Sequence, residues 1–319
     1  MDAVILAGDS GSSVPVLGDN KAFLRYREKP LVLWVVEALE RSRSISSATV
    51  VGPKERLEEV LADYSGPKPL RVWEQGRDVF ENTYYGALST FDAYREGASE
   101  EDLKASPESD KAVFVLTSDL PLIEPFEIDH FIETAPLDSG NIIYGFTRED
   151  LLEPFTPRGV PPGQWWMYYC FKEYIARHSN IFCLRPLHLS AVLEKYVPII
   201  YDLRYQRHLR NVVGGMLAVS RYVLTPGNLY YYFLFQMAKS SHRRGWTGFR
   251  DRLRNHLSKD KVEKRMSAIL QTTGHIHETV GPGPTLDVDD ELSFRELNER
   301  GEEWKRTQLE MLDRARAGL

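Results

Sequence analysis

A loop rich in glycine and serine, with a lysine just beyond it, is the part of this sequence best suited to chemistry. The loop follows a short apolar stretch, and the lysine precedes the next apolar segment. Glycine lets backbone N–H groups approach phosphate oxygens because it carries no Cβ, and lysine adds a compact positive charge. A plain turn is the alternative. We expect a site for a nucleoside triphosphate formed by Leu6, Ala7, Gly8, Gly11, Ser12 and Lys21.

Three aspartates are placed to bind a metal ion. Asp119 follows the apolar stretch 111–117, and Asp287 and Asp289 lie on or just after a second predicted strand. Open α/β sheets bind ligands at the carboxyl ends of their strands, where these side chains would meet. Mg²⁺ prefers one or two carboxylates together with phosphates and water. We therefore predict an Mg²⁺ site at Asp119, Asp287 and Asp289, although aspartates also cap turns and helices.

The elements that must position these residues alternate between strand and helix. Apolar stretches at 2–6, 48–51, 70–73, 111–117 and 141–146 are separated by helical patterns at 31–40, 54–64, 79–94 and 126–134. This alternation predicts an α/β fold, a three-layer Rossmann-like arrangement with a mostly parallel, buried sheet. We expect residues 1–147 to form the nucleotide-binding core.

The alternation ends near Arg148, where a proline-rich stretch begins. We expect residues 148–270 to be an aromatic, mainly helical insertion that serves as an acceptor lobe and contains a strand candidate at 180–184. Residues 271–319 are expected to return to the core with a final strand at 285–289 and a long helix from Glu291 to Arg316. His275 and His277 are expected in a loop, because no third ligand for Zn²⁺ is identifiable.

Net charge and cysteine content indicate which partners and which cellular compartment to expect. The formal net charge of −6 argues against a nucleic-acid-binding protein. The segment 239–265 nevertheless carries ten Lys and Arg residues against three acidic ones, after an aromatic stretch that begins at 212. A helical subdomain with a basic face is the simpler interpretation, and weak contact of 212–265 with a membrane or lipid is the alternative. Two cysteines and no signal peptide favour a cytoplasmic protein.

The motifs taken in order resemble a known group. They are similar to GT-A-type nucleotidyltransferases, especially the branch of molybdenum-cofactor guanylyltransferase. The family pattern Leu-Ala-Gly-Gly-x-Ser-x-Arg aligns with 6–13, its Asp-x-Pro with 119–121, and its Asp-Ile/Val-Asp with 287–289. The resemblance implies transfer of a nucleotidyl group from an NTP to a phosphorylated small molecule, with release of pyrophosphate. It further implies catalytic roles for Lys21 and Asp119, an Mg²⁺ cofactor, and a base-binding region that contains Gln75 and Asn82.

Two departures from the family pattern leave other interpretations open. Asp9 replaces the second glycine, and Ser13 replaces an arginine that contacts phosphate. Arg25, Arg27, Arg77 and Arg158 are candidates to supply the missing charge. One alternative is a glycosyltransferase that uses Asp287 and Asp289 as an Asp-x-Asp metal motif. Another is a nucleotide-binding protein that has lost catalysis.

Overall fold

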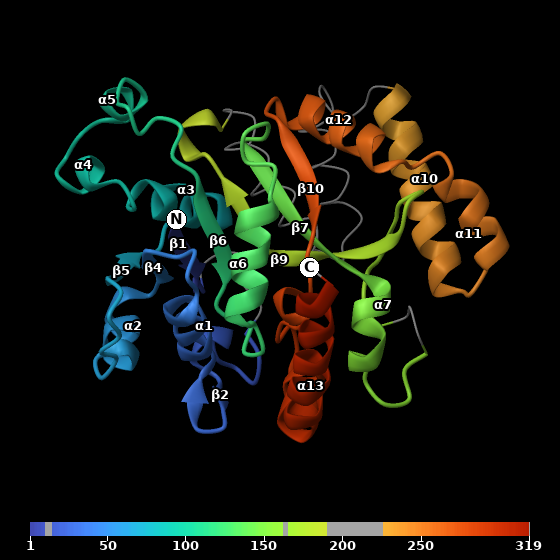
Figure 1. Cartoon of the computed structure of the whole chain (residues 1–319), viewed down its shortest axis with the longest axis horizontal. Helices are drawn as coiled ribbons and strands as arrows, with labels where there is room; N and C mark the ends of the chain where they lie inside the picture. The colour runs from blue at the N-terminus through green and yellow to red at the C-terminus, as the bar shows by residue number, and fades with distance from the viewer. Residues whose placement is uncertain (10–14, 162–164, 190–225, 319) are drawn as a thin grey trace.

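The computed structural model describes residues 1–9, 15–161, 165–189 and 226–318 (Figure 1). An eight-stranded sheet in the order β10-β7-β9-β6-β1-β4-β5 forms its centre, with β8 paired to β9. The strands are β1 (Asp2–Leu6), β4 (Ser47–Gly52), β5 (Leu70–Glu74), β6 (Val113–Thr117), β7 (Ile142–Arg148), β8 (Tyr169–Cys170), β9 (Ile175–Leu184) and β10 (Gly274–Glu278). Only β9 runs against its neighbours β6, β7 and β8, so the predicted mostly parallel α/β sheet is confirmed.

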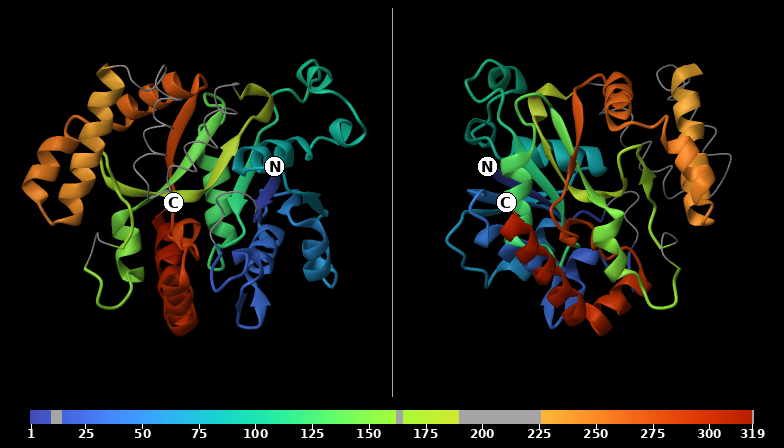
Figure 2. Two further views of the ribbon diagram at one scale, coloured as in Figure 1. Left: turned by 180° about the vertical axis from the view of Figure 1, so that it is seen from behind. Right: turned by 45° about the vertical axis from the view of Figure 1, so that its right-hand side comes forward.

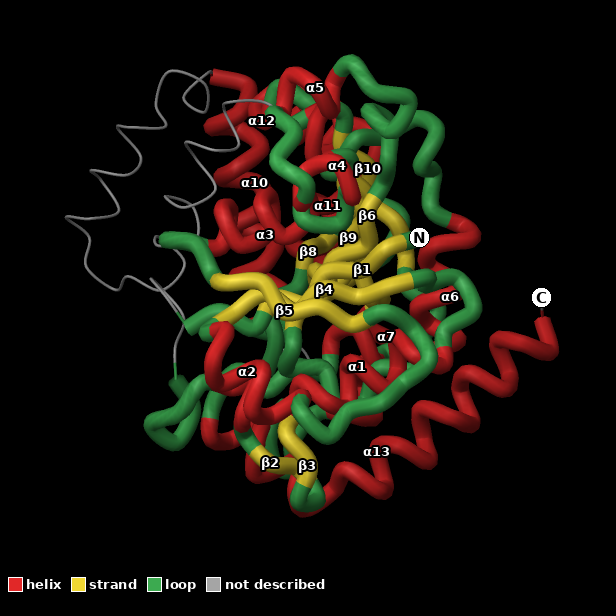
Figure 3. Tube along the Cα trace, turned by 90° about the vertical axis from the view of Figure 1, so that its left-hand side faces the viewer, coloured by secondary structure: helices red, strands yellow, loops and turns green. Residues whose placement is uncertain are grey.

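Helices cover both faces of the sheet because the inner strands are apolar on both sides. One face packs against α1 (Leu31–Arg41), α2 (Lys54–Leu61) and α6 (Pro125–Thr134). The opposite face packs against α3 (Val79–Leu88). Figure 3 shows α1 and α2 on one side of the strands and α3 on the other. Alternate residues of β1 divide between these faces, as a strand buried on both sides requires.

The remaining helices lie at the margins of this core. They are α4 (Asp92–Arg95), α5 (Glu100–Lys104), α7 (Glu149–Leu152), α10 (Pro226–Arg243), α11 (Thr247–Arg254), α12 (Lys259–Leu270) and α13 (Glu291–Gly318). Figure 1 and Figure 2 show α10, α11 and α12 gathered at the β10 end of the molecule. A small hairpin of β2 (Arg25–Tyr26) and β3 (Lys29–Pro30) precedes α1. Among the described residues, no helix is both long and apolar enough to cross a membrane.

Two details of the C-terminal half differ from the sequence-based expectation. The last strand is β10, which carries His275 and His277, whereas the predicted strand at 285–289 is a 3₁₀ turn followed by irregular chain. The irregular chain is favoured because its aspartates turn toward charged partners rather than a neighbouring strand. The second difference is β9, which lies within 148–270 but pairs with both β6 and β7. Residue 148 is therefore no boundary of the sheet, and the described helical part spans 226–270.

A buried carboxyl group ties the C-terminal segment to the core. Glu127 of α6 accepts hydrogen bonds from the Gly283 amide at 2.8 Å, from Gln308 Nε2 at 2.8 Å and from the Glu124 amide at 2.9 Å. A Cβ at Gly283 would collide with this carboxyl group, so glycine is required there for close approach. The contacts fix both the turn that leads into the aspartates and the helix α13 that follows them.

Glu127 makes stability depend on pH. Burial raises the pKa of Glu127 from its ordinary 4.5 to about 7, although nearby hydrogen-bond donors and Lys305 oppose the shift. The folded chain holds this proton more tightly, so the contribution is complete below pH 4.5 and is lost as pH rises through about 7. For this group we expect the free energy of unfolding to fall by about 2.5 kcal/mol between pH 5 and 8, and Glu127→Gln to remove that part of the fall.

Urea unfolding at the two pH values measures this effect. Glu108→Gln, at an exposed position, is the control and should keep the pH dependence of the natural chain. A Glu127→Gln protein less stable than the natural chain at pH 8 would show that the carboxylate is the stabilising form.

Candidate active site

Asn20 positions Lys21 at the end of β1. Its side-chain Nδ2 donates to the carbonyl of Ala7 at 2.8 Å, and its Oδ1 accepts from the amide of Ala22 at 2.9 Å. The second bond caps the 3₁₀ turn Lys21–Phe23, because a short polar side chain can satisfy an amide left free at a helix start. Lys21 is thus part of a turn that Asn20 fixes to the end of the first strand.

Replacement of Asn20 tests this positioning. We expect Asn20→Ala to lower the free energy of unfolding by about 1–2 kcal/mol, because a cap and a buried hydrogen bond are lost together. Chemical unfolding measures the loss. Asn298→Ala, at an exposed position of α13, is the control and should change stability by less than about 0.5 kcal/mol. Equal effects of the two substitutions would contradict a positioning role.

Three aspartates from separate parts of the chain meet beside Lys21. Asp119 follows β6, and its carbonyl accepts the amide of Val288 at 3.1 Å, which places the 286–289 segment alongside. One carboxylate oxygen from each of Asp119, Asp287 and Asp289 lies within 4.8 Å of the others. The three aspartates predicted to share one site are therefore close together in the fold.

Two cations compensate this cluster. Lys21 Nζ lies 2.9 Å from Asp289 Oδ1 and 3.4 Å from Asp119 Oδ2. Arg177 of β9 places Nη2 at 2.9 Å from Asp287 Oδ1 and 3.3 Å from Asp289 Oδ2. Its Nη1 also donates to the carbonyl of Thr285 at 3.2 Å. Sequence reasoning missed Arg177; the available signal was a lone arginine inside an otherwise strand-like stretch.

The surroundings of Asp287 and Asp289 shift their pKa values in opposite directions. Burial raises the pKa of Asp287, and Arg177 only partly offsets this. Burial would also raise the pKa of Asp289, but Lys21 and Arg177 outweigh it and hold that pKa below its usual range. The pKa of Lys21 is raised, because the neighbouring carboxylates overcome the effect of burial. Lys21 therefore remains charged throughout the neutral range.

The cluster fits a divalent cation by the chemistry of its donors. All of its potential ligands are carboxylate oxygens, which Mg²⁺ prefers. Asp119 Oδ1 is buried without a hydrogen-bond partner in the described part of the chain. A buried, unpartnered carboxylate oxygen is costly unless a proton or cation occupies it. Asp119 thus has one oxygen toward Lys21 and one available to a metal ion.

Gly8, Gln75 and Asn82 lie close together after the end of β1. A Cβ at Gly8 would lie 2.5 Å from Asn82 Nδ2 and 3.2 Å from Gln75 Oε1, so only glycine fits without displacement. Gln75 accepts from the Asp9 amide at 2.9 Å and donates to Asp9 Oδ1 at 2.7 Å, while Asn82 Oδ1 accepts from the Gly76 amide. These contacts form a continuous polar wall beside the loop.

The backbone of the loop is partly engaged in the fold itself. The Leu6 carbonyl accepts from the Ser118 amide at 3.0 Å, and the Ala7 amide donates to the Val51 carbonyl at 2.8 Å. These two residues anchor the loop to the sheet in this structure. Gly11 and Ser12 lie outside the described residues.

The four arginines considered as substitutes for the missing family arginine have other contacts. Arg27 pairs with Glu302, Arg77 with Glu81 and Arg158 with Glu303, while Arg25 donates to a backbone carbonyl. Within the described chain, Arg177 is the arginine that contacts the carboxylate cluster. It comes from the sheet rather than from the loop.

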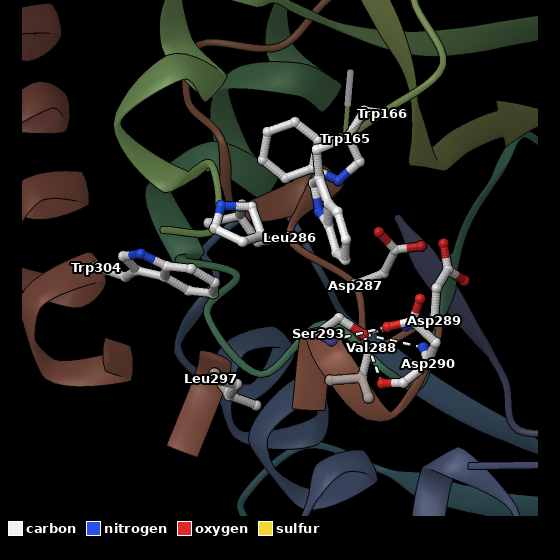
Figure 4. A pocket seen from close by; sticks show the side chains of 11 residues that line it. Trp165, Trp166, Leu286, Asp287, Val288, Asp289, Asp290, Ser293, Leu297 and Trp304 are labelled. Atoms are coloured by element: carbon white, nitrogen blue, oxygen red, sulfur yellow. Dashed lines mark hydrogen bonds between the residues drawn. The ribbon is translucent and has the colours of Figure 1, made fainter. Parts of the chain in front are cut away.

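A cavity adjoins the cluster, and Asp287 and Asp289 are among its lining residues. Its volume is about 110 Å³. Figure 4 shows Asp287 and Asp289 at its edge, with the side chains of Trp165, Trp166 and Trp304 around it. The site therefore combines the carboxylate cluster with an indole-lined cavity that includes Trp165.

Comparison with known proteins settles the family. The sequence profile of the MobA-like NTP transferase domain matches residues 3–214. This chain belongs to the MobA-like NTP transferase family. The matched stretch contains Lys21 and Asp119, whereas Asp287 and Asp289 lie beyond it. A search of curated proteins found no match.

Of three similar solved structures, the first supports the fold. A hypothetical transferase from Thermus thermophilus is 21% identical, with a TM-score of 0.56, over 90% of this chain and 96% of its own. A CMP:2-keto-3-deoxy-manno-octonic acid synthetase complexed with CTP is 13% identical, with a TM-score of 0.45, over 95% of this chain and 98% of its own. A 4-diphosphocytidyl-2C-methyl-D-erythritol synthase from Anaerococcus prevotii is 14% identical, with a TM-score of 0.38, over 61% of this chain and 74% of its own.

Proposed function

We propose that this member of the MobA-like NTP transferase family is an Mg²⁺-dependent nucleotidyltransferase. It moves an NMP group from an NTP to a phosphorylated small-molecule acceptor and releases pyrophosphate. The observation that carries the proposal is the meeting of Lys21 with Asp119, Asp287 and Asp289 at the end of the loop after β1. A nucleophilic side chain is not needed, because the acceptor phosphate itself attacks the α-phosphorus.

Each side of the site has a proposed task. The loop that contains Gly8 lies against the triphosphate, and the wall formed by Gln75 and Asn82 faces the nucleotide. Lys21 offsets negative charge as the α-phosphate is attacked. Asp119, with Asp287 or Asp289, holds Mg²⁺, which when bound supplies a Lewis acid toward the phosphate oxygens. Arg177 keeps the two C-terminal carboxylates in place.

Release of pyrophosphate tests the proposal. The full chain is mixed with Mg²⁺, each common NTP in turn, and a panel of sugar, polyol and cofactor phosphates. We expect pyrophosphate with at least one combination, and we expect Lys21→Ala to lower the rate by about a hundredfold or more. Lys172→Ala, at an exposed position, is the control.

Two further measurements distinguish the alternative functions. Nucleoside diphosphate released from a nucleotide sugar, without pyrophosphate, would favour a glycosyltransferase. NTP binding measured by calorimetry, without turnover of any acceptor, would favour a nucleotide-binding protein that has lost catalysis. Either result would overturn the proposed reaction.

A further inference from the structure

The cavity beside the carboxylate cluster has a composition that discriminates among acceptors. Its apolar lining consists of three indoles with aliphatic residues between them, namely Pro157, Trp165, Trp166, Leu286, Val288, Leu297 and Trp304. Its polar lining consists of Asp287, Asp289, Asp290 and Ser293. No lysine, arginine or histidine lines it among the described residues. A ligand there meets flat apolar rings and carboxylates.

The nearest cations are already engaged. Lys21 and Arg177 are paired with the carboxylate cluster. Arg177 also lies 5.5 Å from the Trp166 ring, and Arg300 lies 5.4 Å from the Trp304 ring. Arg300 is paired with Glu296 and Glu303. A second anionic group on the ligand would therefore be desolvated near carboxylates, with no free counter-charge among the described residues, which is unfavourable.

The same contacts reduce the attraction for a cationic ligand. Two of the three indoles already have an arginine within the range of a cation–π interaction, so an added cation would meet a like charge. Trp165 remains, half-buried, as a ring for apolar stacking. Asp290 is exposed and makes no ion pair in the described structure, although its Oδ1 accepts from the Ser293 amide at 2.8 Å. Its carboxylate can accept from a ligand hydroxyl.

We propose that this cavity, defined by Trp165, Trp166 and Trp304, is the subsite for the non-phosphate part of the acceptor. This inference rests on the proposed function. The part it binds is an uncharged group that carries hydroxyls and has an apolar face, as in a sugar or polyol phosphate. The ring stacks on Trp165, a hydroxyl donates to Asp290, and the phosphate extends toward the proposed Mg²⁺ site at Asp287 and Asp289. Acceptors with a carboxylate in addition to the phosphate are rejected.

Matched pairs of ligands test the proposal, because the indoles provide a fluorescence signal. Quenching of tryptophan fluorescence is titrated on the full chain in Mg²⁺ buffer. Glucose 1-phosphate is compared with glucuronic acid 1-phosphate, and glycerol 3-phosphate with 3-phosphoglycerate. In at least one pair we expect the uncharged member to bind about tenfold more tightly or better. Equal binding within both pairs, tighter binding of the acidic members, no binding of any ligand, or tighter binding of phosphocholine would each overturn the proposal.

Variants locate the binding in this cavity. We expect Trp165→Leu to weaken binding of the preferred ligand by about tenfold, and Trp246→Leu, on the exposed turn between α10 and α11, to leave it unchanged. Asp290→Asn keeps a residue suited to a helix N-terminus and should reduce the discrimination against the acidic member several-fold. Equal effects of Trp165→Leu and Trp246→Leu would place the binding elsewhere.

The two proposals fail in different ways. If the chain binds glucose 1-phosphate through Trp165 but releases no pyrophosphate with any NTP, the subsite is supported and the proposed reaction is refuted. If the chain releases pyrophosphate equally well with acidic and uncharged acceptors, the reaction is supported and the proposed subsite is refuted.

Discussion

Asp119→Asn is expected to lower the rate of pyrophosphate release by about a thousandfold, or about 4 kcal/mol of transition-state stabilisation. The asparagine keeps the shape of the side chain but removes the charge that faces both Lys21 and the proposed metal site. The fold should tolerate the change, because one of three clustered negative charges disappears. We expect the free energy of unfolding to stay within about 0.5 kcal/mol of the natural value or to rise.

Two measurements on the same variant separate function from folding. Thermal unfolding is followed with and without Mg²⁺, and the natural chain should gain stability from the ion whereas the Asp119→Asn chain should gain less. Asp138→Asn, at an exposed position, is the matched control and should behave like the natural chain in both assays. A fully active Asp119→Asn protein would refute the catalytic role of this carboxylate.

Arg177→Met should be the most destabilising of the substitutions considered. Arg177 and Asp287 form a pair whose side chains are 9% and 5% exposed, so removal of the arginine leaves a buried carboxylate without its main counter-charge. Breaking a buried pair in this way costs about 3–5 kcal/mol. Urea unfolding at pH 8, where an unpaired carboxylate is most costly, measures the loss.

The double variant Arg177→Met with Asp287→Leu provides the decisive comparison. Replacing both members of a buried pair by apolar residues often restores stability, so the double variant should recover most of the loss. The catalytic activity should not return, because a carboxylate of the cluster is gone. A loss below about 1 kcal/mol in the single variant would mean that solvent already screens this pair.

The sequence predicted the parallel part of the fold well, because period and length of its apolar stretches are local signals. β1, β6, α1, α2 and α3 lie at the stretches that those signals marked, whereas α4 and α5 were not predicted as separate helices. Only the second half of β9, 180–184, was predicted as a strand, because Arg177 and the polar residues after it interrupt the apolar pattern. The structure explains the interruption, since Arg177 turns toward the aspartates instead of the hydrophobic core.

In the candidate site too, the sequence predicted which residues meet but not the contacts that hold them. The expectation that Asp119, Asp287 and Asp289 gather around Lys21 came from where strands were predicted to end. The three aspartates do lie together, although 285–289 is not a strand. The partners that hold them were not predictable, because Asn20 acts through the carbonyl of Ala7 and Arg177 through the carbonyl of Thr285. Contacts of this kind depend on the sheet order, which no local pattern in the sequence specifies.

The most direct test is the position of a bound metal ion. Crystals of the full chain grown with Mn²⁺ and an NTP would reveal the ion by its anomalous scattering, since Mn²⁺ accepts the same oxygen ligands as Mg²⁺. We predict an ion bound by Asp119 and by Asp287 or Asp289, in contact with the phosphates and with Lys21 beside it. An NTP bound elsewhere, or an ion away from these carboxylates, would contradict the account.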